Sequence, residues 1–266
     1  MSLSAVLDAL ALPSEAKVEQ RIPKKLLVEQ GARTAADKRQ IQDGIEELMW
    51  VAALKPTNIG VPVFRDSERE YLEVDVLTVQ FRPNAKVTRL LELIHRTIPY
   101  PVLLAASFHD ANKTCVGVSA AHKRFNQNEV GKFVVDEVLA TSAIALDALP
   151  SANVQGFMAA MGLSHQPNRD LFALYQGWLD CIVGFTVAGV AGRFVRPASP
   201  EQAKEMRAFM QNRAHLLGEL SALCGQASKE KQMNRLVELN MSIKRLESQL
   251  AANQSVLMPC NQPPFT

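Results

Sequence analysis

Three carboxylates that lie close together in the sequence could do metal-assisted chemistry. Glu70, Glu73 and Asp75 stand on or just before a strand-like segment. Acidic side chains at strand ends can hold a divalent metal ion for phosphodiester cleavage, so this spacing would suit a metal-dependent nuclease. Alternation along a half-buried strand gives the other interpretation, in which Glu73 and Asp75 are its solvent side. The alternation favours this second interpretation.

Cationic residues form three short groups that could contact phosphates or the carboxylates of a partner. They are Arg21, Lys24 and Lys25; His95 and Arg96; and His122, Lys123 and Arg124. If the fold brings them together, binding to DNA would be electrostatic and dependent on salt. The alternative is that each group is a solvated loop or strand end. His95 also flanks the apolar stripe of a helix, which favours a hydrogen-bonded structural histidine.

Common catalytic and cofactor-binding motifs are absent from the sequence. There is no phosphate-binding glycine loop, no dinucleotide fingerprint, no zinc-protease motif and no nucleophile elbow. The four cysteines are scattered and lack metal-ligand spacing, so we predict no metal and no cofactor. A net charge of +2 is too small to indicate nucleic-acid binding by itself.

The central elements that would position these residues are a helix and a β-hairpin. Apolar residues at helical spacing predict a helix over Ala85–Ile98, with Asn84 as its N-cap and Pro99 as its stop. Val102–Phe108 and Thr114–Ala121 are typical of two buried strands. Tyr71–Phe81 is the clearest strand, and its shifted apolar phase predicts either a β-bulge near Val76 and Leu77 or a strand whose far half is buried on both faces. Lys132–Ala140 fits a strand or a helix.

The C-terminal half is typical of helices. Arg169–Ala191 predicts a long buried helix, and Glu201–Cys224 with Lys229–Ala252 predicts an antiparallel helical hairpin. The second hairpin helix has a heptad-like seam made of Leu236, Leu239, Ile243, Leu246 and Leu250. This seam could pack within the chain, on a partner protein, or on a second copy in a self-assembling structural protein.

These elements together predict an α+β fold in which a small antiparallel sheet carries a packed helix and is followed by a helical C-terminal half. The expected divisions are an α+β domain over 1–150, a helical extension packed on it over 151–198, the helical hairpin over 199–252 and a tail over 253–266. No signal-peptide pattern opens the chain, and the apolar run Cys181–Gly192 is too short to span a bilayer. We therefore expect a cytoplasmic protein that does not insert into membranes.

Five segments in order resemble a bacterial domain family of unknown function. They are IPKK (Ile22–Lys25), ELMWVAALKP (Glu47–Pro56), IHRTIPYPVLL (Ile94–Leu104), LYQGW (Leu174–Trp178) and KQMNRLVELN (Lys231–Asn240). Members of that family are commonly encoded beside helicases and DNA methyltransferases in phage-defence or restriction islands. The resemblance implies a non-catalytic accessory subunit that binds a helicase or methyltransferase, with DNA as a further candidate contact.

Overall fold

The computed structural model describes residues 3–110, 113–127, 129, 132–145 and 150–256. It confirms the α+β class, with a mostly antiparallel sheet and a helical C-terminal half. The main sheet has the order β1-β2-β5-β6-β7-β10, and β11 also pairs with β7. Its strands are β1 (Lys17–Arg21), β2 (Ile45–Leu54), β5 (Val74–Phe81), β6 (Val102–Asp110), β7 (Lys113–Ala120), β10 (Leu139–Ala140) and β11 (Ile144–Ala145).

The sheet is larger than predicted and contains one parallel pair. Strands β5 and β6 run parallel and are joined by the crossover helix α5 (Val87–Thr97), whereas β6 and β7 form the predicted hairpin. A parallel pair needs such a crossover, because the chain must return to the same end of the sheet. The predicted helix begins later than expected, since Lys86 is its N-cap and Asn84 has a positive φ of 66°.

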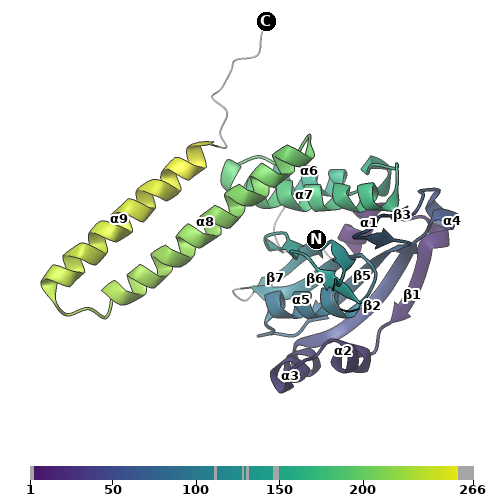
Figure 1. Ribbon diagram of the computed structural model, residues 1–266, viewed down its shortest axis with the longest axis horizontal. Helices are drawn as coiled ribbons and strands as arrows, with labels where there is room; N and C mark the ends of the chain where they lie inside the picture. Colours follow the sequence, from purple (N-terminus) through teal and green to yellow (C-terminus); the bar gives the residue numbers. More distant parts are fainter. Residues whose placement is uncertain (1–2, 111–112, 128, 130–131, 146–149, 257–266) are drawn as a thin grey trace, which may run out of the picture.

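Each face of the sheet is covered by a different set of helices. One face packs on α5, α2 (Lys24–Gln30) and α3 (Ala35–Gly44), and the other packs on α1 (Leu3–Leu10), α6 (Ala152–Ala160) and α7 (Leu171–Ala191). Figure 1 shows α6 and α7 on one side of the sheet and α2 and α3 on the other. Strand β5 is therefore buried on both faces along Val74–Leu77, which is its first half. The far half, for which burial on both faces was an alternative, has an exposed residue at Gln80.

The apolar phase shift in the predicted strand has two physical causes. Val74 and Val76 belong to the α7 side of the core, and Leu77 and Val79 belong to the α5 side. A register shift also lies beside this point, between Trp50 and Ala52 of β2. The bulge predicted near Val76 is thus carried by the neighbouring strand, and its extra residue is Val51.

Short elements connect these layers. They are the 3₁₀ helices over Ser14–Ala16 and Leu163–His165, α4 (Pro56–Ile59), the hairpin of β3 (Phe64–Arg65) with β4 (Glu70–Tyr71), and the hairpin of β8 (Lys123–Phe125) with β9 (Phe133–Val135). The segment Lys132–Ala140, which fitted either a strand or a helix, is extended and contributes β9 and β10.

Helix α7 is the main helix on the face of the sheet that α1 and α6 also cover. Asp170 caps it by accepting a hydrogen bond from the Ala173 N–H, and Gly192 ends it with a φ of 78°. Of the described helices, α7 alone is long and apolar enough to cross a membrane, but 72% of its apolar window is buried inside the protein. Its packing is that of a core helix.

Helices α8 (Pro200–Ala227) and α9 (Met233–Val256) form the predicted hairpin. Figure 1 shows them as a long arm that projects beyond the sheet, and we call this hairpin the arm. The turn lies later than expected, because α8 continues through Gly225 to Ala227. The predicted tail over 253–266 begins inside α9, and its residues 257–266 lie outside the described part of the chain.

Candidate functional site

The three carboxylates of the nuclease hypothesis each have a separate partner. Glu70 pairs with Arg65 at 2.6 Å, Glu73 pairs with Lys55 at 2.9 Å, and Asp75 accepts a hydrogen bond of 3.1 Å from the Trp50 indole. Glu70 lies in the small β3–β4 hairpin, whereas Asp75 is buried in the main sheet.

Burial and the nearby charge of Glu73 raise the pKa of Asp75 to about 7. Glu73 and Asp75 are therefore not the solvent side of the strand. Both side chains are buried, with exposed fractions of 7% for Glu73 and 3% for Asp75. Within the described residues, no group of three or more His, Cys, Asp or Glu side chains is arranged to hold a metal ion. The contacts favour a structural role for these carboxylates.

Two of the predicted contact residues are buried instead of exposed. The Lys123 ammonium donates hydrogen bonds to the backbone oxygens of Ile98 and Tyr100, which lie just after α5. Burial lowers its pKa to about 7, and the nearby Asp75 opposes that shift. His95 is completely buried, and its Nε2 lies 3.0 Å from the Ser119 hydroxyl oxygen. Neither side chain can reach DNA or a partner protein in this fold.

The remaining cations are divided between two parts of the surface. Arg21 lies 3.7 Å from Glu47, and Lys25 lies 3.6 Å from Glu29. Burial, followed by the charges of Arg82 and Arg21, lowers the pKa of Lys24, so these three cations are neighbours. Arg124 belongs to a different part of the surface, where it pairs with Asp136. Arg96 is exposed in the last turn of α5.

His122 is part of a chain of hydrogen bonds that runs from Tyr71 of β4 to Gln176 and Asp180 of α7. Its Nδ1 lies 2.5 Å from the Tyr71 hydroxyl and its Nε2 lies 2.8 Å from Gln176 Oε1, while Gln176 Nε2 donates to Asp180 at 2.7 Å. An amide oxygen can only accept, so Nε2 of His122 bears the proton and Nδ1 accepts from Tyr71. Burial lowers the His122 pKa to about 4, which keeps the ring neutral at pH 7.

A polar pocket of about 320 Å³ opens beside this chain. Asp136 pairs with two cations at its rim, Arg69 at 2.9 Å and Arg124 at 3.1 Å. Phe172 forms a wall and stacks on the His122 ring with centroids 4.9 Å apart. The lining residues are Arg69, His122, Asp136, Glu137, Leu139, Phe172, Gln176, Leu179 and Arg207. Two arginines and two carboxylates leave the pocket close to neutral.

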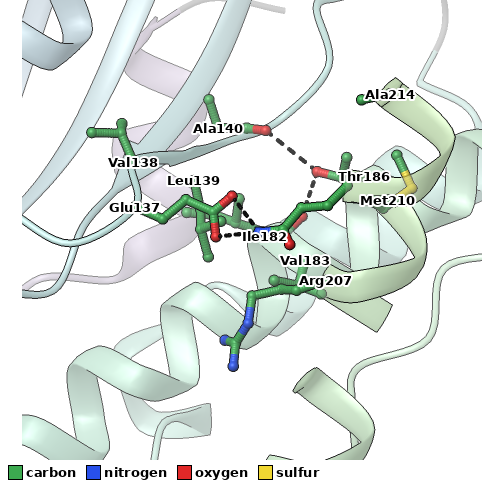
Figure 2. Close-up of a pocket in the computed structure, with 11 residues that line it drawn as sticks. Glu137, Val138, Leu139, Ala140, Ile182, Val183, Thr186, Arg207, Met210 and Ala214 are labelled. Carbon is green, nitrogen blue, oxygen red and sulfur yellow. Dashed lines mark hydrogen bonds between the residues drawn. The ribbon is translucent and has the colours of Figure 1, made fainter. Parts of the chain in front are cut away.

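An apolar pocket of about 270 Å³ adjoins the polar one where α8 leaves the body of the protein (Figure 2). Both pockets are lined by Glu137, Leu139 and Arg207. The other residues that line the apolar pocket are Val138, Ala140, Ile182, Val183, Thr186, Met210, Gln211 and Ala214. We call the two pockets together the basal groove.

Hydrogen bonds fix both walls of the basal groove. Thr186 of α7 donates to the Ala140 oxygen at 3.3 Å, and the Gln211 amide of α8 donates to the Glu137 carboxylate at 3.0 Å. Figure 2 shows Glu137 and Ala140 from the β10 segment facing Thr186 and Met210 across the opening. The groove is therefore a preformed concave surface, apolar inside and polar at its rim.

Sequence reasoning identified only His122 and Arg124 near this groove. Arg69, Asp136, Gln176 and Arg207 come from four distant segments and share no motif or spacing, so no local pattern signals them. The groove exists because β10 pairs with β7 while α7 and α8 cross above it. That arrangement depends on tertiary packing.

Comparison with known proteins gives a family and no activity. A family model described as "Domain of unknown function (DUF4391)" matches residues 10–250. No curated protein and no solved structure matches the chain.

Proposed function

We propose that this chain, which belongs to the DUF4391 family, is an accessory subunit that binds a partner protein through the basal groove. The observation that supports this most directly is the groove itself. An apolar pocket of about 270 Å³ with a polar rim has the form of a site for an apolar anchor side chain at a protein interface.

The burial and the hydrogen bonds of His95, Ser119, His122 and Asp75 support the same proposal. A catalytic base or nucleophile must reach substrate. His95 and Ser119 are buried together, and both ring nitrogens of His122 are engaged. The Asp75 carboxylate accepts from Trp50 below the surface of the sheet. These contacts stabilise the fold and leave binding as the function that the geometry supports best.

The proposed partner is a helicase or a DNA methyltransferase of a bacterial defence or restriction assembly. The support for this class is the resemblance of five sequence segments to a family whose members are encoded beside such enzymes. A direct contact with DNA would use the cations at the β1 edge, where Arg21, Lys24 and Arg82 are neighbours. Such an assembly would act in the cytoplasm.

Co-purification with the helicase and methyltransferase encoded beside the gene tests the proposal. Ala214→Trp places a large ring at the mouth of the groove, and we expect at least a tenfold loss of partner affinity, equal to about 1.4 kcal/mol. Ala222→Trp is the matched control, because Ala222 is an exposed alanine on the same helix outside the groove. If the wild-type chain co-purifies with neither the helicase nor the methyltransferase, the proposal is contradicted. Equal partner affinity of Ala214→Trp and Ala222→Trp contradicts it as well.

A further inference from the structure

Helix α8 uses two of its sides for different contacts. On one side, the half-buried residues Leu216, Leu220 and Leu223 face α9. The half-buried residues of α9 over 233–252 are those of the predicted seam, Leu236, Leu239, Ile243, Leu246 and Leu250. The seam is therefore used within the chain. On another side, α8 lines the basal groove, and this side is open to a partner.

Arg207 on the groove side of α8 is a half-buried cation without a partner of its own. It lines both pockets of the groove, but it has no hydrogen bond and no ion pair with any residue that the structure describes. Figure 2 shows its guanidinium turned away from Glu137 and Thr186. Burial lowers the pKa of His122, and the charges of Arg69 and then Arg207 lower it further. The guanidinium therefore belongs to the polar end of the groove.

The charged groups on the opposite wall already have partners. Asp136 pairs with Arg69 at 2.9 Å and with Arg124 at 3.1 Å. Both carboxylate oxygens of Glu137 accept from the Gln211 amide, at 3.0 and 3.1 Å. The groove is nearly neutral in total, but its charge is unevenly satisfied, with the unpaired cation on the α8 wall. A half-buried guanidinium has lost part of its hydration, so a carboxylate that reaches it forms a strong, charge-assisted contact.

The position of Arg207 places this cation beside the apolar pocket. Met210 follows it by three residues and Ala214 by seven, so all three lie on one side of α8. At 1.5 Å per residue, these two residues lie about 5 Å and about 10 Å from Arg207 along the helix axis. An occupant of both pockets therefore needs its apolar group and its acidic group within this range of one another. Side chains two residues apart on an extended chain point the same way and are about 7 Å apart.

We propose that the basal groove recognises a partner segment in which an acidic side chain lies two residues from an apolar one. The apolar side chain fills the pocket of about 270 Å³, and the carboxylate pairs with Arg207 in the polar pocket beside it. This inference rests on the proposed function and adds the chemistry of the partner to it. Charge complementarity selects the acidic class, because an uncharged segment leaves Arg207 unpaired and a basic one places a like charge beside it.

Two blocked pentapeptides test the charge requirement without the natural partner. One has the sequence Glu-Ala-Leu-Ala-Glu, which offers an acid two residues from leucine in either chain direction, and the other has glutamine in place of both glutamates. NMR of the full chain with isotope-labelled methionine methyl groups follows Met210 during titration to millimolar peptide. We expect the acidic peptide to bind at least fivefold more tightly, because only its carboxylate forms a charge-assisted pair.

Three variants of the chain assign this preference to a residue. Arg207→Gln should abolish it, so that the two peptides bind equally. Lys204→Gln is the matched control, because it removes the same charge from an exposed residue of α8 that lines neither pocket, and the preference should persist. Glu137→Gln should tighten binding of the acidic peptide, since it removes a like charge from the groove. The methionine methyl spectrum of each free variant checks that the fold is retained.

An acidic peptide that binds no more tightly than its glutamine analogue overturns the proposal. A preference that survives Arg207→Gln, or that Lys204→Gln removes equally, overturns it too. So does tighter binding of a third peptide with lysine in place of both glutamates, which would assign the groove to a basic partner. The proposed function is judged separately with the co-purified partner. If Ala214→Trp weakens that complex and Arg207→Gln does not, the function stands and this inference fails.

Discussion

The hydroxyl of Tyr71 lies 2.5 Å from Nδ1 of His122 and donates a hydrogen bond to it. This contact joins the β3–β4 hairpin to the segment that follows β7. His122 lines the polar end of the basal groove, and both of its ring nitrogens are engaged in hydrogen bonds.

Tyr71→Phe removes this donor and leaves Nδ1 of a buried ring without a partner. An unsatisfied buried acceptor costs about 1–3 kcal/mol, so we expect the free energy of unfolding in urea to fall by that amount. Tyr100→Phe is the control, since Tyr100 is an exposed tyrosine. A loss of the same size in both variants would contradict the hydrogen bond.

The neutral state of His122 can be observed directly. Its folded pKa of about 4 lies below the ordinary value of 6.5, so between those values the unfolded chain binds more protons. The stability that His122 contributes is therefore complete above about pH 6.5 and is lost as the pH falls towards 4. Nitrogen NMR of the imidazole at pH 5.5 should show a neutral ring with the proton on Nε2. A charged ring at that pH would exclude the described contacts.

Asp75→Asn should remove a contribution to stability whose dependence on pH has the opposite sign to that of His122. The folded carboxyl keeps its proton up to about pH 7, whereas the unfolded one loses it near 4, so the Asp75 contribution falls as the pH rises through that window. Asparagine has no such titration and still offers an acceptor to Trp50. From pH 5 to pH 7 we expect the variant to gain on the order of 2 kcal/mol relative to wild type. Urea unfolding measures it, with Glu29→Gln as the exposed control.

Tyr175→Phe should loosen α7 from the sheet. The Tyr175 hydroxyl donates to the Val102 oxygen at 2.7 Å and accepts from the Ala121 N–H at 2.8 Å. Removing it leaves both buried backbone groups without this partner, so we expect a loss of about 1–3 kcal/mol in the free energy of unfolding. Tyr100→Phe again serves as the control, and an unchanged urea midpoint for Tyr175→Phe would show that another group replaces the hydroxyl.

Ile243→Ala should destabilise the arm and leave the sheet unaffected. Ile243 is half-buried in the seam between α8 and α9, and α9 has no fully buried residue over 233–252. Amide hydrogen exchange should accelerate in α9 and the outer half of α8 and stay unchanged in β5 and β6. Lys244→Ala removes an exposed neighbour and should change neither region. Equal acceleration in the sheet would show that arm and body unfold together.

Much of the architecture could be predicted because it depends on local periodicity. The α5 helix, the β6–β7 hairpin and the seam of α9, with its four leucines and one isoleucine, each follow from apolar spacing in one segment. The parallel pairing of β5 with β6 could not be predicted in this way, because it depends on which strands become neighbours. Gly225 predicts an earlier turn between α8 and α9 than the structure has, because this glycine is tolerated inside an exposed helix.

The positions of charged residues were harder to predict than the elements. Lys123 follows a strand and looks like a solvated strand end, yet the two backbone oxygens after α5 provide partners for a buried ammonium. Glu73 and Asp75 alternate with apolar residues, which is typical of a half-exposed strand, but both are buried. Burial of a strand on its second face is set by distant segments and is not encoded in the strand itself.

Helix α8 runs without interruption from Pro200 to Ala227, so it behaves as a rod that is held near one end. Its inner part forms a wall of the basal groove through Arg207, Met210 and Ala214, and its outer part lies beyond the body. A displacement of the outer part that is transmitted along this helix would change the shape of the groove. A contact at the tip that shifts α8 would then alter the affinity of the groove for its partner, and reciprocity would require the partner to alter the affinity at the tip by the same factor.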